Sequence, residues 1–227
     1  MARKAAAKKA MRASEASLTD RAYSDLEGLI VTLKLAPGSA VSEAALSKQL
    51  GIGRTPIREA LQRLARERLV TILPRRGIIV SEINIGSQLR LLEVRREVER
   101  LVAKSAARRA TPEERARFAQ MAKDFEKAAK GNDEVNFMRV DREYNELSVV
   151  AARNEFAAGA MALVHSLSRR FWYIHYKKAA DMPRAAKLHA DVARSIAAQD
   201  EDAAAGASDR LIGYIEQFTR DTVSADA

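Results

Sequence analysis

The feature that most constrains the fold is a pair of short amphipathic segments joined by a glycine-containing turn, within residues 41–64. The first segment begins after Ser42, whose hydroxyl suits a helix start, and ends at Gly51, which suits a helix C-terminus. The second begins near Pro56, a residue tolerated at the first helical position, with Thr55 as its expected cap. Two helices joined by a turn of about four residues predict a helix-turn-helix.

The flanking segments extend this pattern to a winged form. Apolar residues recur at helical spacing from Leu18 to Leu33, which predicts a preceding helix. On the other side, β-branched runs at 69–73 and 78–80 are separated by Pro-Arg-Arg-Gly, which predicts a two-stranded hairpin with a basic tip. Three helices and a two-stranded wing are therefore expected over residues 18–82, after a basic flexible tail at 1–17.

The rest of the chain has a different character. Ala-rich stretches of helical periodicity alternate with helix caps and breakers, and no strand pattern occurs. The predicted helices cover residues 87–109, 112–130, 133–151, 154–180, 184–199 and 202–222. The expected fold is mainly α: the winged helix-turn-helix, a linker at 83–86, and an antiparallel bundle of about six helices over 87–224 that binds an effector and dimerises.

Net charge also separates the two halves. The chain carries +9, of which residues 1–82 contribute +7, from 15 Lys and Arg against 8 Asp and Glu. A basic excess on one compact region is typical of proteins that bind polyanions. The absence of cysteine excludes disulfides, thiolate nucleophiles and cysteine-rich zinc sites. Apolar runs are far shorter than the roughly 20 residues of a membrane span, so a cytoplasmic protein without membrane contact is expected.

Arginine is concentrated where a helix-turn-helix would meet DNA. Residues 54–76 contain seven arginines and two acidic residues, and Arg54, Arg58 and Arg63 lie in the first turns of the second segment. A guanidinium can bond bidentately to guanine or to phosphate, and hydroxyls at helix starts can donate to phosphates. The expected contacts with double-stranded DNA are Ser42, Arg54, Thr55, Arg58, Arg75 and Arg76. The competing interpretation is that these arginines only solvate a helix face.

The segment VSEAALSKQLGIGRTPIREALQRLARERLVTILPRRGIIV closely resembles the GntR family of transcriptional regulators, and GRTPIREALQRL followed by PRRG is a specific signature. The resemblance implies a homodimeric winged helix-turn-helix, which we expect to bind a near-palindromic operator. It implies base and phosphate contacts by Arg54, Thr55 and Arg58, with Arg76 and Gly77 of the wing entering the minor groove.

The C-terminal half resembles the FCD ligand-binding domain of the FadR branch of that family, through LLEVRREVERLVAKSAA, DREYNELSVVAARNEF and KLHADVARSIAAQDEDAAAG. Many FCD domains hold a divalent metal through an Asp, a His four residues later and two further His. Asp141 and His189 match two of these candidate ligands, whereas Asn145 and Leu211 replace the others. Since Asn is a poor donor to zinc or nickel, a tightly bound metal is not expected, and His165 is a weak substitute.

An organic acid is the expected effector. By resemblance, Arg95 points into the FCD cavity, where its guanidinium would bind a carboxylate, with Asp141, Asn145 and His189 nearby. Two alternatives stay open. Arg95 can pair with Glu99 four residues further on, and Arg169, the remaining candidate effector contact, can face solvent or a dimer partner.

Together these features predict a ligand-responsive transcriptional regulator, a repressor without a catalytic site. Two alternatives are a metal-dependent helical-bundle enzyme and an architectural protein that binds nucleic acid without sequence preference. The enzyme is disfavoured because the chain has three scattered His and no Glu-x-x-His pair. The architectural protein would show steep salt dependence with no preferred duplex sequence.

Overall fold

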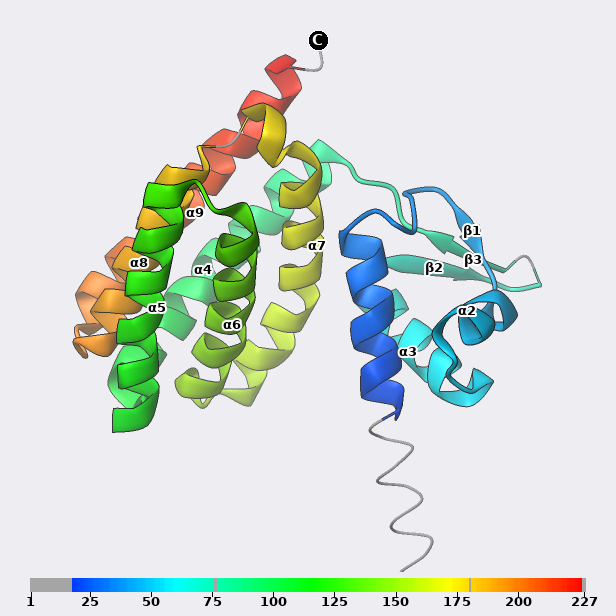
Figure 1. Cartoon of the computed structure of the whole chain (residues 1–227), viewed down its shortest axis with the longest axis horizontal. Coiled ribbons are helices and arrows are strands. Elements are labelled where there is room, and N and C mark those ends of the chain that lie inside the picture. Colours follow the sequence, from blue (N-terminus) through cyan, green and yellow to red (C-terminus); the bar gives the residue numbers. More distant parts are fainter. Residues whose placement is uncertain (1–17, 76, 180, 226–227) are drawn as a thin grey trace, which may run out of the picture. The chain divides into compact units, whose positions relative to one another are not determined.

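The computed structural model describes residues 18–75, 77–179 and 181–225, which form two compact units (Figure 1). The winged-helix unit comprises the described residues up to Ile83 together with Ser166–Tyr173. The helical unit comprises Asn84–His165 and the described residues from Ile174 onward. The expected basic tail at 1–17 and the wing residue Arg76 lie outside the described residues.

The helices of the winged-helix unit follow the local signals of the sequence. A first helix is described over residues 18–31, followed by α2 (Glu43–Leu50) and α3 (Arg54–Arg66). The Ser42 hydroxyl caps α2 by accepting from the backbone N–H of Ala45 at 3.2 Å, and Gly51 ends it in the left-handed conformation. The expected cap of α3 was wrong: Gly53 occupies that position, and Thr55 lies within the first turn.

The sheet has one strand more than the sequence predicted. β1 (Ala40–Val41), β2 (Val70–Leu73) and β3 (Gly77–Val80) form an antiparallel sheet in the order β1-β3-β2. The predicted hairpin is β2 and β3, in a register that pairs Val70 with Val80 and Leu73 with Gly77. The additional strand β1 pairs Ala40 with Ile79, because the link between the first helix and α2 runs along the outer edge of β3.

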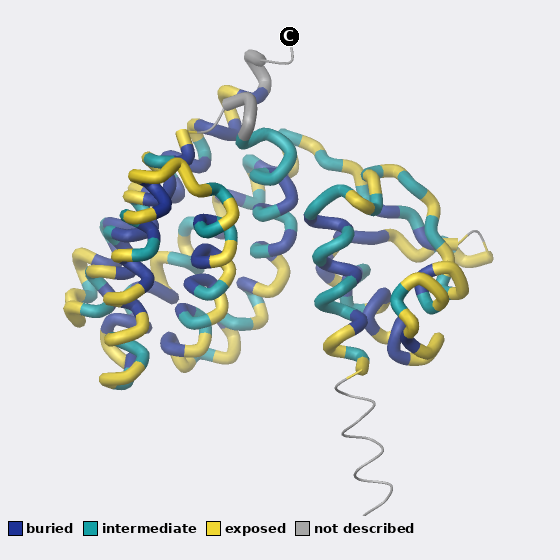
Figure 2. Tube along the Cα trace, in the orientation of Figure 1, coloured by how far each residue is buried: buried dark blue, intermediate teal, exposed yellow. Residues whose placement is uncertain are grey.

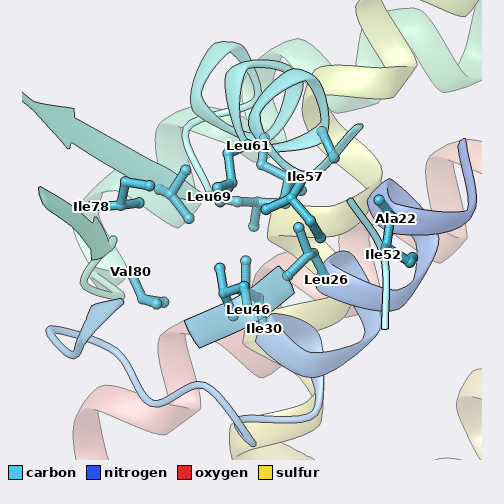
Figure 3. Close-up of a cluster of buried hydrophobic side chains, with 13 residues drawn as sticks. Ala22, Leu26, Ile30, Leu46, Ile52, Ile57, Leu61, Leu69, Ile78 and Val80 are labelled. Atoms are coloured by element: carbon cyan, nitrogen blue, oxygen red, sulfur yellow. The ribbon is translucent and has the colours of Figure 1, made fainter. Parts of the chain in front are cut away.

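One apolar core holds the three helices and the sheet of this unit together. Figure 3 shows side chains of the first helix, α2, α3 and the strands pointing toward one another. Its buried members are Ala22, Leu26, Ile30, Leu46, Ile52, Ile57, Ala60, Leu61, Leu64, Leu69, Val70, Ile78 and Val80. A buried Leu or Ile side chain contributes about 1.5–3 kcal/mol, so this core fixes how α3 is presented.

The helical unit contains the six predicted helices, with ends within three residues of the expected ones across the described part of the chain. They are α4 (Ile85–Arg109), α5 (Pro112–Gly131), α6 (Glu134–Ala152), α7 (Glu155–Ala179), α8 (Met182–Ala197) and α9 (Glu201–Ala225). Polar caps start several of them: Asn84 caps α4, and Thr111 with Glu114 forms a capping box on α5. Because α4 begins at Ile85, the expected linker at 83–86 is partly helical.

Within the helical unit α5 packs on α8, α4 packs on α9, and α6 packs on both α4 and α5. Buried and exposed residues alternate along most of these helices, as Figure 2 shows. Phe118 and Phe125 of α5 are fully buried and form the aromatic centre of this packing with Phe137 and Tyr144 of α6. Among the described residues, no helix is long and apolar enough to cross a bilayer.

Candidate DNA interface and effector site

The exposed face of α3 carries the first group of candidate site residues. Arg54, Thr55 and Arg58 are exposed, whereas Ile57 and Leu61 on the opposite face are buried in the core. Residues 54 and 58 are four apart and therefore share a helix face. The N-cap residue of α3 is Gly53, which has no side chain to accept from the first backbone N–H groups of the helix. These N–H groups can therefore bind a phosphate. The structure thus presents an arginine-rich helix start to solvent.

Arg58 has a partner that the sequence did not indicate. Its Nε and Nη2 donate to Oε1 and Oε2 of Glu43 at 2.9 and 2.8 Å, which joins α3 to the first residue of α2. The hydrogen bond from Arg58 holds the pKa of Glu43 below its usual value, so the carboxylate stays charged. The two residues are 15 positions apart on different helices, and no sequence periodicity relates them.

Arg63, which the sequence grouped with these arginines, faces the other way. Its guanidinium carbon lies 3.6 Å from the centre of the Tyr23 ring, and its Nε donates to Glu67 at 3.3 Å. The Tyr23 hydroxyl donates to the second Glu67 oxygen at 2.7 Å. Burial raises the pKa of Glu67 above its usual 4.5. Arg63 therefore joins α3 to the first helix, where its side chain serves packing.

The wing contributes the second group. Arg75 and Gly77 are exposed at the turn between β2 and β3, and both have positive φ, 62° and 97°. A positive φ is strained for a side chain such as arginine, so the turn presents Arg75 in a conformation that the strand pairing imposes. Ser42, expected to donate to a phosphate, already accepts a backbone hydrogen bond as the α2 cap, and its O–H can still donate.

A buried polar cluster lies in the helical unit, where the sequence predicted an effector site. His189 of α8 has Nε2 3.2 Å from Oδ1 of Asp141 on α6, and Nδ1 2.8 Å from the carbonyl of Ala185. Because a carbonyl oxygen only accepts, Nδ1 carries a proton. The rings of Phe125 and Tyr144 surround the imidazole, with centroids at 5.1 and 5.8 Å. His189 is thus held at both nitrogens.

Arg95 forms the ion pair with Glu99 that its i,i+4 spacing allowed. Its Nε donates to Glu99 at 2.7 Å, and both side chains are largely buried. His165 of α7 lies at the edge of this pair, with Nε2 4.0 Å from Glu99. Burial first, and then the negative charge of Glu99, raise the pKa of Tyr144 on α6. Arg95 is therefore paired along its own helix, and the negative charge of this pair acts on a buried tyrosine of α6.

The donor set does not fit the metal that FCD domains commonly hold. Asn145 and Leu211 are both buried. Of the four ligand positions, one therefore holds a poor donor and another holds no donor at all. In the described part of the chain, no group of three or more His, Cys, Asp or Glu side chains is arranged to hold a metal ion. Asp141 and His189 bond to each other instead.

Arg169, the remaining candidate effector contact, is not brought to this cluster. It lies in the segment of α7 that belongs to the winged-helix unit, where its Nη1 donates to Glu27 at 3.0 Å. The adjacent Arg170 is 1% exposed, and its Nη2 donates to the carbonyl of Ser81. Burial lowers the pKa of Arg170. Both arginines therefore pack within the winged-helix unit, a grouping that helical periodicity could not reveal.

Comparison with known proteins agrees with this architecture. The profile "Bacterial regulatory proteins, gntR family" matches residues 18–80, and the FCD domain profile matches residues 90–213. An HTH-type regulator from an unstable DNA locus of Streptomyces ambofaciens is 45% identical over 62 residues, 27% of this chain and 26% of that protein. The transcriptional repressor RspR of Escherichia coli K12 is 24% identical over 198 residues, 87% of each chain.

Among solved structures, E. coli McbR/YncC superposes with a TM-score of 0.74 at 18% identity, covering 91% of this chain and 98% of that one. This likeness extends the shared fold across both units. The two profile matches fall one on each unit, at residues 18–80 and 90–213. The chain therefore belongs to the gntR family of bacterial regulatory proteins and carries the FCD domain in its C-terminal half.

Proposed function

We propose that this protein is a ligand-responsive transcriptional regulator that binds operator DNA through α3 and the wing. The observation that carries the proposal is the exposed face of α3, where Arg54, Thr55 and Arg58 stand beside an uncapped helix start on a rigid apolar core. An exposed, arginine-bearing helix of this kind fits a major groove, and the guanidinium fork matches guanine O6 and N7. Arg75 and Arg76 of the wing add contacts to the adjacent backbone or minor groove.

The proposed active form is a homodimer on a near-palindromic operator. Two copies of α3 would then enter successive major grooves, which are about 34 Å apart along the duplex. Such a complex forms where the bacterial chromosome lies, so the protein acts in the cytoplasm. Repression is the proposed outcome, because an operator-bound dimer excludes other proteins from the same site. The chain would act by binding alone, without a catalytic step.

The proposed effector site is the polar cluster around Asp141, Asn145 and His189, with Arg95 beside it. A small organic acid would bind there by exchanging its carboxylate for Glu99 on the Arg95 guanidinium, in a charge-assisted bidentate bond. A ligand shifts the equilibrium between two arrangements of the winged-helix units only by the difference in its affinity for them. The expected coupling between effector and operator is about 1–3 kcal/mol.

A selection from a random double-stranded library tests the DNA-reading role. Wild type is expected to enrich a specific sequence, and Arg58→Ala to lose that enrichment. Arg108→Ala is the matched control, because Arg108 also forms an exposed two-bond pair with a glutamate, Glu201, but lies in the helical unit. If wild type enriched no sequence, or if Arg58→Ala selected the same sequence as wild type, the proposal would be wrong.

A thermal-shift screen of small carboxylic acids tests the effector role. An acid that raises the melting temperature of wild type should lose most of its effect in Asp141→Asn or Arg95→Gln. Arg142→Gln is a matched control, because Arg142 of α6 is exposed and pairs with Glu146 along its own helix. An acid that stabilised all of these variants equally would bind elsewhere, and the proposed cluster would be abandoned.

A further inference from the structure

The ion pair between Arg58 and Glu43 has a specific geometry. The carboxylate of Glu43 binds the guanidinium from the side, through Nε and one N–H of Nη2. A guanidinium has five N–H donors in a planar array, and the side-on fork uses two of them. The end-on fork, made of one N–H of Nη1 and the second N–H of Nη2, is left for another acceptor pair. No described residue accepts from Nη1 at hydrogen-bond distance.

The end-on fork is the part of arginine that matches guanine. Guanine presents O6 and N7 side by side in the major groove, and an arginine bonds to both at once. The side chain of Arg58 is 61% exposed, so the fork is open to a ligand. With its plane fixed by Glu43, the guanidinium loses less rotamer freedom when it binds a base than a free arginine would.

We propose that Glu43 is a positioning residue that holds Arg58 for guanine readout; this inference rests on the proposed function of α3. A phosphate contact would not call for this arrangement. A carboxylate beside the arginine repels the DNA backbone, and the negative charge lowers the nonspecific attraction that phosphates supply. The ion pair therefore lowers the affinity for DNA of any sequence but gives the Arg58 guanidinium a defined orientation, which favours discrimination between bases.

Glu43 is also well placed to be rigid. It is the first residue of α2, directly after the Ser42 cap, and Leu46 anchors this short helix in the core. The hydrogen bond from Arg58 lowers the pKa of Glu43, and the positive charge of Arg54 lowers it further, so the carboxylate stays charged. Exposed ion pairs add little to stability, so removing the Glu43 charge should leave the fold intact.

Sequence selection with the full-length chain tests the inference, using wild type, Arg58→Ala, Glu43→Gln and Glu59→Gln. Arg58→Ala first identifies the base position that Arg58 reads. Glu59→Gln is the matched control: Glu59 is exposed on α3 next to Arg58, but it accepts from Thr19 instead. Both glutamine variants remove one negative charge from the winged-helix unit, and only Glu43→Gln removes the partner of Arg58. Melting temperatures of all four proteins show that they are folded.

We expect Glu43→Gln to lower the preference for guanine at that position by roughly 5- to 30-fold, within the range of a bidentate arginine–guanine contact. Its affinity for mixed-sequence duplex should stay equal or rise. Glu59→Gln should keep the wild-type preference.

Four results would overturn the inference. If Glu43→Gln kept the guanine that Arg58→Ala loses, positioning by Glu43 would be wrong, while DNA reading by α3 would stand. Equal losses in both glutamine variants would point to a general charge effect. If Glu43→Gln bound no duplex and melted at a lower temperature than wild type, the role of Glu43 would be structural. An absence of any enrichment by wild type would remove the proposed function itself, and the inference with it.

Discussion

Arg63→Ala is the sharpest test of how the structure divides the arginines of α3. Arg58 and Arg63 lie on one helix, yet the first faces solvent and the second contacts Tyr23 and Glu67. We expect Arg63→Ala to destabilise the winged-helix unit and to leave the preferred DNA sequence unchanged. Arg58→Ala should do the reverse. The pair of variants therefore separates packing from reading within a single helix.

The magnitude follows from the contacts of Arg63. Its bond to Glu67 is the larger contribution, because the Glu67 side chain is 6% exposed and would lose a charged partner, at a cost of about 1–3 kcal/mol. The cation–π contact with Tyr23 adds about 0.5–1 kcal/mol at a partly exposed site. The pair with Asp20 contributes little, because the Asp20 side chain is 75% exposed. Since Tyr23 still donates to Glu67, we expect a total of about 1–3 kcal/mol.

Native-state hydrogen exchange can measure the loss of stability in the winged-helix unit separately from the helical unit. Amides of α3 and β3 should exchange about 5- to 150-fold faster in Arg63→Ala than in wild type, whereas amides of α5 should exchange at the wild-type rate. The DNA selection described above provides the second readout. If Arg63→Ala kept wild-type exchange rates but lost sequence preference, the assignment of Arg63 to packing would be refuted.

Three further predictions concern a buried aromatic ring, a buried carboxyl group and metal binding. Phe125→Ala should cost about 3–5 kcal/mol because the ring is fully buried, whereas the same change at Phe156, 82% exposed, should stay within about 0.5 kcal/mol; thermal melts of both variants check this. Burial raises the pKa of Glu67 above its usual 4.5, so the contribution of this group to stability is full below pH 4.5 and is lost as the pH rises through the raised pKa. Glu67→Gln should therefore lose less stability than wild type as the pH rises above 4.5 in urea titrations. Dialysis against a chelator should leave the melting temperature unchanged, since the described part of the chain lacks a metal-binding group; stoichiometric metal in native mass spectra would contradict this.

Much of the fold could be predicted from the sequence because helix ends carry local signals. Ser42, Gly51 and Thr111 act within one helical turn, and each marks a boundary that the structure places there. The predicted cap of α3 was wrong because Gly53 starts this helix without a side-chain hydrogen bond. A cap of this kind leaves no recognisable residue pattern in the sequence. Strand β1 was missed because two residues are too short for an alternating pattern.

Some features of the candidate site could likewise be predicted from the sequence, and others could not. Exposure of Arg54 and Arg58 follows from helical periodicity once Ile57 and Leu61 are assigned to the core. The partner of Arg58 could not be predicted, because Glu43 reaches it only through the angle between α2 and α3. The i,i+4 spacing of Arg95 and Glu99 allowed their pairing but could not choose it over a ligand.

By itself, the sequence determined where helices begin and end, which faces are apolar, and that one compact region is basic. These properties depend on neighbours within a few residues, through caps, backbone hydrogen bonds and the helical repeat. Tertiary structure alone decided which arginine meets Glu43 and which meets Tyr23, that His189 bonds Asp141, and that Arg169 joins the winged-helix unit. Those partners lie tens of residues apart or on different helices, and only the packing of cores sets their distances.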